Sequence, residues 1–226
     1  MVSILVVYES GEGQTAKVSE YVENVLTARG HDVTVRRVAD AADVDVTLYD
    51  AVLVGSPVHY RTHLPEVVEF IEANLEALSA RPNGFFQLSL ASTIPLKVAQ
   101  RGDDAYVDSL VTKTGWQPDH VGRFAGAVTY SQYNPVERMV FKLLAAVTTG
   151  DTDTSRDYEY TDWDDVDAFA TAFADDVEAR LERDTATRRH AGTRRFTWAA
   201  TGVVLLLGVM AFAYWAAARQ FVPAEC

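Results

Sequence analysis

The sequence contains only one cysteine, and that cysteine is the last residue, Cys226. A single terminal thiol excludes a disulfide framework, a cysteine-based metal cluster and an internal thiol nucleophile. Lysine is scarce as well, because only 4 of the 20 basic residues are lysine. Proteins that bind nucleic acid need clustered lysine and arginine, so the composition argues against a nucleic-acid partner. No metal site is predicted.

The acidic residues are distributed unevenly along the chain. Residues 1–182 contain 14 Lys and Arg against 30 Asp and Glu, a balance of −16, whereas residues 183–226 contain 6 against 2, a balance of +4. An acidic surface with little lysine is typical of halophilic proteins, in which carboxylates hold water and salt screens their repulsion. An ordinary acidic soluble protein is the alternative.

The C-terminal part contains a long apolar run. Residues 196–218 include no Asp, Glu, Lys or Arg, and a helix of that length spans about 30 Å of hydrocarbon. Aromatic residues lie near both ends of the run, as at membrane interfaces: Phe196, Trp198, Tyr214 and Trp215. Residues 183–195 form a basic linker. By the positive-inside rule, we expect a single-pass protein of the cell membrane with residues 1–182 in the cytoplasm.

The first 182 residues alternate between strand and helix patterns. Apolar strand patterns occur at residues 3–8, 31–38, 48–60, 84–92 and 122–130. Helical spacing of apolar residues occurs at residues 16–30, 64–78, 103–115, 136–147 and 162–181. Five apolar strands separated by helices predict an α/β domain with a five-stranded parallel sheet covered by helices on both faces.

A polar loop, residues 9–15, follows the first predicted strand. Ligands of open α/β sheets bind beyond the carboxyl ends of the strands, and small residues before a helix N-terminus suit a phosphate. The loop has no lysine, which excludes a Walker P-loop. Gly11 and Gly13 with Ala16 are compatible with a dinucleotide pattern, although no acidic residue ends the second strand. From the loop alone, a phosphomonoester held by neutral donors and a generic strand-to-helix turn stay open as well.

Two segments resemble a known family. Ser10-x-x-Gly13-x-Thr15 resembles the FMN phosphate loop of flavodoxins, and "GDTDTSRDYEYTDWDDV" (150–166) resembles a segment of the flavodoxin-like, menaquinone-dependent protoporphyrinogen IX dehydrogenases. Residues 115–144 resemble the same family. The resemblance covers about residues 1–182 and implies a flavodoxin fold, FMN as the cofactor, and oxidation of protoporphyrinogen IX in haem biosynthesis with a quinone as acceptor. The apolar C-terminal run is an addition to that family's pattern.

The resemblance also implies site residues. The FMN phosphate is expected at Ser10, Gly11, Glu12, Gly13, Gln14 and Thr15. The flavin ring is expected between Pro57, Val58, His59 and Tyr60 on one side and Ser89, Leu90, Ala91 and Ser92 on the other. Tyr130, Ser131 and Tyr133 are candidates for the pocket wall. Tyr60 is a candidate stacking ring, and His59 is a candidate proton donor or shuttle, although either side chain could be merely structural or solvated.

The segment 152–163 has two interpretations. It could cover the substrate or cofactor, or it could be a structural cap in which Thr161 or Asp162 caps the last helix and Trp163 packs on the sheet. The apolar helix predicted at 135–147 could be core or could touch the bilayer. The resulting hypothesis is a membrane-tethered, FMN-dependent porphyrinogen dehydrogenase. A tethered flavodoxin-type electron carrier that docks through its acidic face, a flavin quinone reductase and a module without cofactor are the alternatives.

Overall fold

A computed structural model describes residues 1–41, 44–89, 97–128 and 158–183. The chain divides into two compact units, residues 1–177 and residues 178–226. No helix within the described ranges is long and apolar enough to cross a membrane. The predicted membrane span, 196–218, lies outside those ranges, as does the predicted helix 136–147.

Five parallel strands form the central sheet, as the alternation of strand and helix patterns predicts. They are β1 (Ser3–Tyr8), β2 (Asp32–Arg37), β3 (Ala51–His59), β5 (Asn83–Ser89) and β6 (His120–Ala125). Their order is β2-β1-β3-β5-β6, with the short strand β4 (Thr62–His63) paired antiparallel to β3. The order reverses direction at β1 and β3, and this is the place where an open sheet leaves a crevice at its carboxyl ends.

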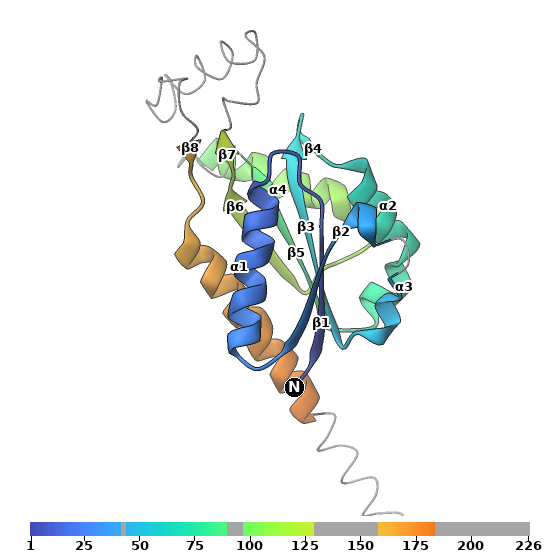
Figure 1. The fold of residues 1–226 in the computed structure, drawn as a ribbon. Helices are drawn as coiled ribbons and strands as arrows, with labels where there is room; N and C mark the ends of the chain where they lie inside the picture. Colours follow the sequence, from blue (N-terminus) through green and yellow to red (C-terminus); the bar gives the residue numbers. More distant parts are fainter. Residues whose placement is uncertain (42–43, 90–96, 129–157, 184–226) are drawn as a thin grey trace, which may run out of the picture. The chain divides into compact units, whose positions relative to one another are not determined.

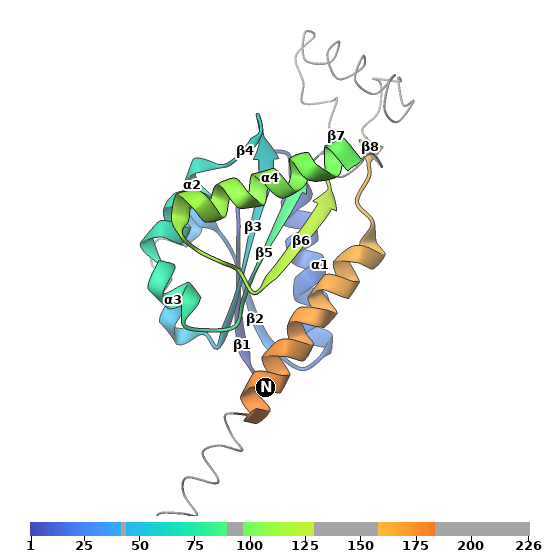
Figure 2. The same cartoon turned by 180° about the vertical axis from the view of Figure 1, so that it is seen from behind.

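Helices cover both faces of the sheet (Figures 1 and 2). Helix α1 (Gln14–Ala28) and the helix that begins at residue 163 lie on one face. Helices α2 (Pro65–Ala73), α3 (Leu75–Ser79) and α4 (Lys97–Thr114) lie on the other. Two short 3-10 helices, η1 (Val38–Asp40) and η2 (Val46–Leu48), lie between β2 and β3. A sheet covered by helices on both faces needs strands that are buried on both sides, without alternation of buried and exposed residues. Strands β1, β3 and β5 are of this kind.

The core consists of apolar side chains on both faces of these strands. The cluster on the face of α2 and α4 includes Leu5, Val7, Val52, Val54, Val67, Ile71, Phe85, Leu110 and Trp116. On the other face, Phe86 contacts Phe124 and Phe169. Gly55 leaves space for the Phe86 ring, which would lie 2.3 Å from a Cβ at that position. Burial of each large side chain contributes about 1.5–3 kcal/mol, and this packing fixes the strand ends from which the loops emerge.

Three local features differ from the predicted pattern. The helix predicted at 64–78 is divided between α2 and α3, because Asn74 has non-helical backbone angles and its side-chain amide donates to the Phe70 carbonyl at 2.9 Å. Helix α4 begins earlier than predicted, at Lys97. The strand predicted at 122–130 ends at Ala125, after which β7 (Ala127–Val128) pairs antiparallel with β8 (Tyr158–Glu159).

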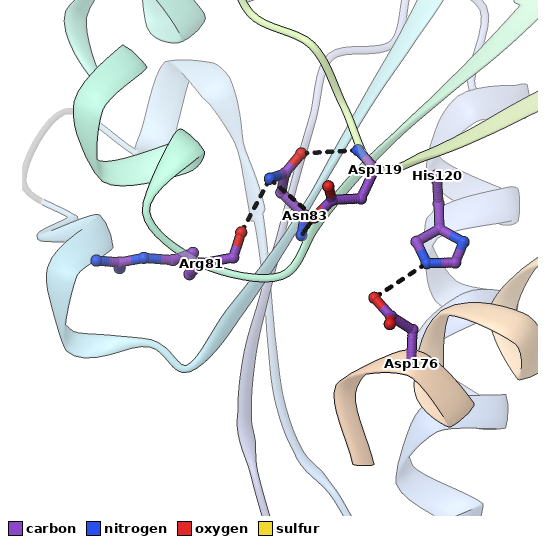
Figure 3. Close-up of polar contacts among 5 residues, drawn as sticks. All are labelled: Arg81, Asn83, Asp119, His120 and Asp176. Atoms are coloured by element: carbon purple, nitrogen blue, oxygen red, sulfur yellow. Dashed lines mark hydrogen bonds and ion pairs between the residues drawn. The ribbon is translucent and has the colours of Figure 1, made fainter. Parts of the chain in front are cut away.

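The amino ends of β5 and β6 are joined by polar contacts (Figure 3). The Asn83 side chain donates to the Arg81 carbonyl at 2.9 Å and accepts the Asp119 N–H at 3.2 Å. His120 of β6 pairs with Asp176 of the last helix at 3.3 Å. These contacts stabilise the end of the sheet that lies opposite the candidate site.

Candidate functional site

The loop between β1 and α1 presents an uncapped helix N-terminus. Gly13, the residue before α1, has φ +93°, a left-handed conformation that costs other residues about 1–2 kcal/mol. Within the described part of the chain, no side chain caps α1 at this point. The first backbone N–H groups of a helix have no partner inside the helix, so those of Gln14 and Thr15 are available to an anion.

The hydroxyl of Ser10 is also arranged to bind an anion. Its oxygen accepts the Gly13 N–H at 3.0 Å, so the hydroxyl proton is left for donation to a ligand. Ser10 is buried, as are Gln14 and Thr15, whereas Gly11 and Gly13 are exposed. The loop therefore combines buried hydroxyls with exposed backbone that a phosphate can approach closely.

An ion pair supports this loop from one side. The Glu9 carboxylate is 7% exposed, accepts the Ser10 N–H at 3.0 Å and lies 2.5 Å from Nε of Arg37. The second guanidinium nitrogen of Arg37, Nη2, donates to the Ser10 carbonyl at 2.9 Å. The hydrogen bond and the charge of Glu9 raise the pKa of Arg37 above its ordinary value. Sequence reasoning missed this pair, because nothing in the sequence places the end of β2 against the loop.

The turn between β3 and β4 lies beside the loop. A Cβ added at Gly11 would be 3.0 Å from Nε2 of His59, so the structure brings together two predicted site residues from different segments. Tyr60 and Arg61 form the two-residue turn with φ of 48° and 68°, a conformation that usually requires Asn or Gly. Such strain persists only where the surroundings hold it. Tyr60 is 92% exposed, and its stacking role stays a prediction.

A buried polar network lies below this turn. His63 of β4 contacts Oε1 of Gln87 at 3.0 Å, and the Gln87 amide donates to Oδ1 of Asp103 at 2.7 Å. Ser89 donates to the same Asp103 oxygen at 2.6 Å. All four residues are buried, and their hydrogen bonds join β4, β5 and α4. Ser89, a predicted flavin contact, directs its hydroxyl to Asp103.

The direction of these hydrogen bonds determines which ring nitrogen of His63 carries a proton. The Gln87 amide nitrogen donates to Asp103, so its oxygen faces His63 and accepts a hydrogen bond from the Nε2–H of that ring. Burial lowers the pKa of His63 below its ordinary value, although Gln87 and Asp103 act in the opposite direction. The sequence signal for this network was a glutamine within the apolar strand 84–92.

The segment 158–163 is attached to α1. The side-chain amide of Gln14 donates to the Thr161 hydroxyl at 2.9 Å, and that hydroxyl donates to the Ala125 carbonyl at 2.8 Å. Lys17 pairs with Glu159 at 2.9 Å and lowers the pKa of that carboxyl. The phosphate-loop helix, the end of β6 and the segment 158–163 therefore form one hydrogen-bonded unit.

Asp162 and Trp163 make different contacts in this segment. Asp162 accepts the Asp164 N–H at 3.0 Å, which confirms Asp162 as the cap of the last helix. Trp163, which the sequence predicts to pack on the sheet, instead contacts the Tyr21 ring of α1, with centroids 5.0 Å apart, and its Nε1 donates to Glu159 at 3.2 Å.

The remaining predicted site residues divide into two groups. Pro57 is buried and Val58 is half-buried at the end of β3, beside His59. The others lie outside the described residues: Leu90, Ala91, Ser92, Tyr130, Ser131 and Tyr133. Their contacts with a flavin stay predictions.

The flavodoxin domain family matches residues 5–155. The chain belongs to this family. Protoporphyrinogen IX dehydrogenase [quinone] of Escherichia coli K12 is 27% identical over 170 residues, which are 75% of this chain and 93% of the relative. The enzyme of the same name from Leishmania major is 28% identical over 176 residues, 75% of this chain and 74% of the relative. A solved Streptococcus pneumoniae flavodoxin, 15% identical, covers 79% of this chain and 99% of its own, with a TM-score of 0.47.

This flavodoxin-family protein binds FMN, and the residues of the loop fit that cofactor. A phosphate site requires hydrogen-bond donors that bulky side chains do not cover. The loop supplies an uncapped helix N-terminus, the hydroxyl proton of Ser10 and a glycine with φ +93°. A Cβ at Gly11 would lie 3.0 Å from Nε2 of His59, so a side chain there would have to displace the His59 ring slightly. Ser10, Gly13, Gln14 and Thr15 are therefore the residues that would hold the phosphate.

Replacement Thr15→Val tests the loop. The isosteric change removes one hydroxyl donor, and a hydrogen bond to a charged group contributes about 1.5–3 kcal/mol. We expect FMN affinity to fall by about tenfold or more, with riboflavin affinity unchanged, because riboflavin has no phosphate. Fluorescence titration of the flavin-free protein measures both, and Thr27→Val, an exposed threonine on the same helix, is the control. Unchanged FMN affinity would contradict the assignment.

Acid should destabilise the protein through His63. Its pKa in the folded state lies below the ordinary value of 6.5, so below that pH the unfolded chain binds a proton that the folded chain does not. The free energy of unfolding should therefore fall between about pH 7 and about pH 5. His63→Gln, which can still donate to Gln87, should lose this part of the pH dependence. Urea unfolding across that range measures it, and identical slopes for both proteins would exclude the mechanism.

Proposed function

We propose that the protein oxidises protoporphyrinogen IX to protoporphyrin IX and passes the electrons to a quinone. The proposal refines what family membership establishes, a flavodoxin-like oxidoreductase with FMN. Two relatives that bear the name of this enzyme match 75% of the chain. The structural observation that carries the proposal is the hydrogen bond between Gln14 and Thr161. It attaches the segment that resembles these dehydrogenases directly to the phosphate-loop helix.

The chain's contribution to this reaction is binding and positioning. When bound, FMN would supply the redox chemistry, accepting two electrons at a time and passing them to the quinone, so that the six-electron oxidation of one porphyrinogen uses three flavin cycles and reduces three quinones. Ser10 and Thr15 hold the phosphate, and the strained turn at Tyr60 and Arg61 follows directly on His59, whose ring lies beside the loop. Nε2 of His59 lies near Gly11, so this nitrogen faces the phosphate loop. The reaction does not require a protein acid or base, and a proton-transfer role for His59 stays a prediction.

An assay of the full-length, FMN-loaded protein tests the proposed reaction. Under anaerobic conditions with protoporphyrinogen IX and a menaquinone analogue, porphyrin fluorescence should appear, and its rate should depend on both the protein and the quinone. The flavin-free protein is the control for spontaneous oxidation. The assay is run at low and at molar salt, because the acidic composition predicts a halophilic protein. No porphyrin at either salt concentration, with flavin that cycles only with a protein partner, would instead indicate an electron carrier.

We further propose that residues 196–218 anchor the protein in the cell membrane with residues 1–182 on the cytoplasmic side. The support is compositional: an uncharged run of spanning length follows a basic linker at 183–195. Both proposed small-molecule partners, a porphyrinogen and a lipid quinone, are apolar enough to concentrate at a bilayer. The proposed location therefore agrees with the proposed chemistry.

Cell fractionation tests the anchor. The full chain should sediment with membranes and resist extraction by molar salt, because burial of an apolar helix is not screened by ions. It should be released by detergent. A chain truncated after residue 195 should be soluble and should retain FMN. Release of the full chain by salt alone, or membrane retention of the truncated chain, would show that residues 196–218 are not the anchor.

A further inference from the structure

The phosphate loop is acidic, although the ligand that it holds is an anion. Glu9 and Glu12 lie within residues 9–15, and the loop contains no lysine or arginine. The Glu9 carboxylate is buried and accepts the N–H of Ser10, the residue that supplies a hydroxyl to the phosphate site. A negative charge at this position opposes the phosphate, and the effect is larger where protein excludes water. An additional group must therefore compensate this charge.

Arg37 meets this requirement from the carboxyl end of β2. Its Nε lies 2.5 Å from Oε1 of Glu9 and its Nη2 donates to the Ser10 carbonyl at 2.9 Å. The planar guanidinium thus contacts the carboxylate and the adjacent backbone at the same time, a geometry that lysine cannot reproduce. Both backbone polar groups of Ser10 are held, the N–H by Glu9 and the carbonyl by Arg37.

These contacts also determine how the Ser10 hydroxyl is presented. Because the Ser10 backbone is held at both ends, its side chain is fixed in the position where it accepts the Gly13 N–H at 3.0 Å. The hydroxyl proton then remains available to the phosphate. Arg37 therefore acts on the ligand through Glu9 and Ser10.

We propose that Arg37 is a positioning residue for the FMN phosphate. It neutralises Glu9 and fixes Ser10, and it acts through these two residues without touching the flavin. The proposal concerns cofactor binding and does not depend on which substrate is oxidised. Because the phosphate is the part of FMN that riboflavin lacks, Arg37 should determine the preference of the protein for FMN over riboflavin.

Flavin titrations of the full-length, flavin-free protein test this role. Arg37→Gln leaves the Glu9 charge uncompensated, so FMN affinity should fall by about tenfold or more. Riboflavin affinity on the same samples should change by less than about twofold, which also shows that the fold is intact. Glu9→Gln combined with Arg37→Gln removes the opposing charge, and this double variant should recover most of the FMN affinity. Arg37→Lys keeps the positive charge but lacks the planar guanidinium. Its FMN affinity should therefore lie between that of the unchanged protein and that of Arg37→Gln.

Arg36→Gln is the matched control. Arg36 precedes Arg37 on the same strand, is exposed, and donates to the neighbouring Val35 carbonyl. Its replacement makes the same change in net charge and should leave the ratio of FMN to riboflavin affinity unchanged. The salt concentration gives a second measurement. Because Arg37 is half-exposed, the loss of FMN affinity caused by Arg37→Gln should be smaller at molar salt.

Three results would overturn the proposal. Equal losses of FMN and riboflavin affinity in Arg37→Gln would mean that Arg37 supports the fold in general. A double variant as weak as Arg37→Gln alone would mean that Arg37 does not act by neutralising Glu9. An unchanged FMN affinity in Arg37→Gln would mean that the charge of Glu9 does not reach the ligand.

Discussion

The site depends on one electrostatic feature, the uncapped N-terminus of α1. A helix start that lacks a capping side chain exposes backbone N–H groups and the positive end of the helix dipole. Gly13 makes this start possible, because its φ of +93° turns the chain from β1 into α1 without a side chain in the way. The buried core under β1 and α1 then fixes where these groups point.

The residues around this anion site hold a strained turn in place. The turn at Tyr60 and Arg61 adopts positive φ angles, and the buried chain from His63 through Gln87 to Asp103 ties the following strand to α4. A satisfied buried network of this kind confers rigidity, whereas a broken one is costly. Rigidity at the β3–β4 turn and charge compensation at the loop 9–15 are therefore supplied by separate groups of residues.

The sequence predicted what depends on local pattern. The five parallel strands, the loop 9–15 and the cap at Asp162 follow from apolar periodicity, strand-end chemistry and N-cap preference. It could not predict contacts between residues far apart in the chain: Arg37 reaches Glu9 across 28 positions. The break at Asn74 was missed because its side-chain bond to Phe70 competes with a helix that periodicity alone favours.

Amide-resolved NMR of the flavin-free protein tests the central claim most directly, that the start of α1 holds the FMN phosphate. FMN should shift the amide signals of Gln14 and Thr15 strongly, because their N–H groups meet a charged acceptor. Riboflavin should leave these signals nearly unchanged and should affect those of His59 and Tyr60 as FMN does. Equal shifts at the loop with both flavins would show that the start of α1 does not hold the phosphate.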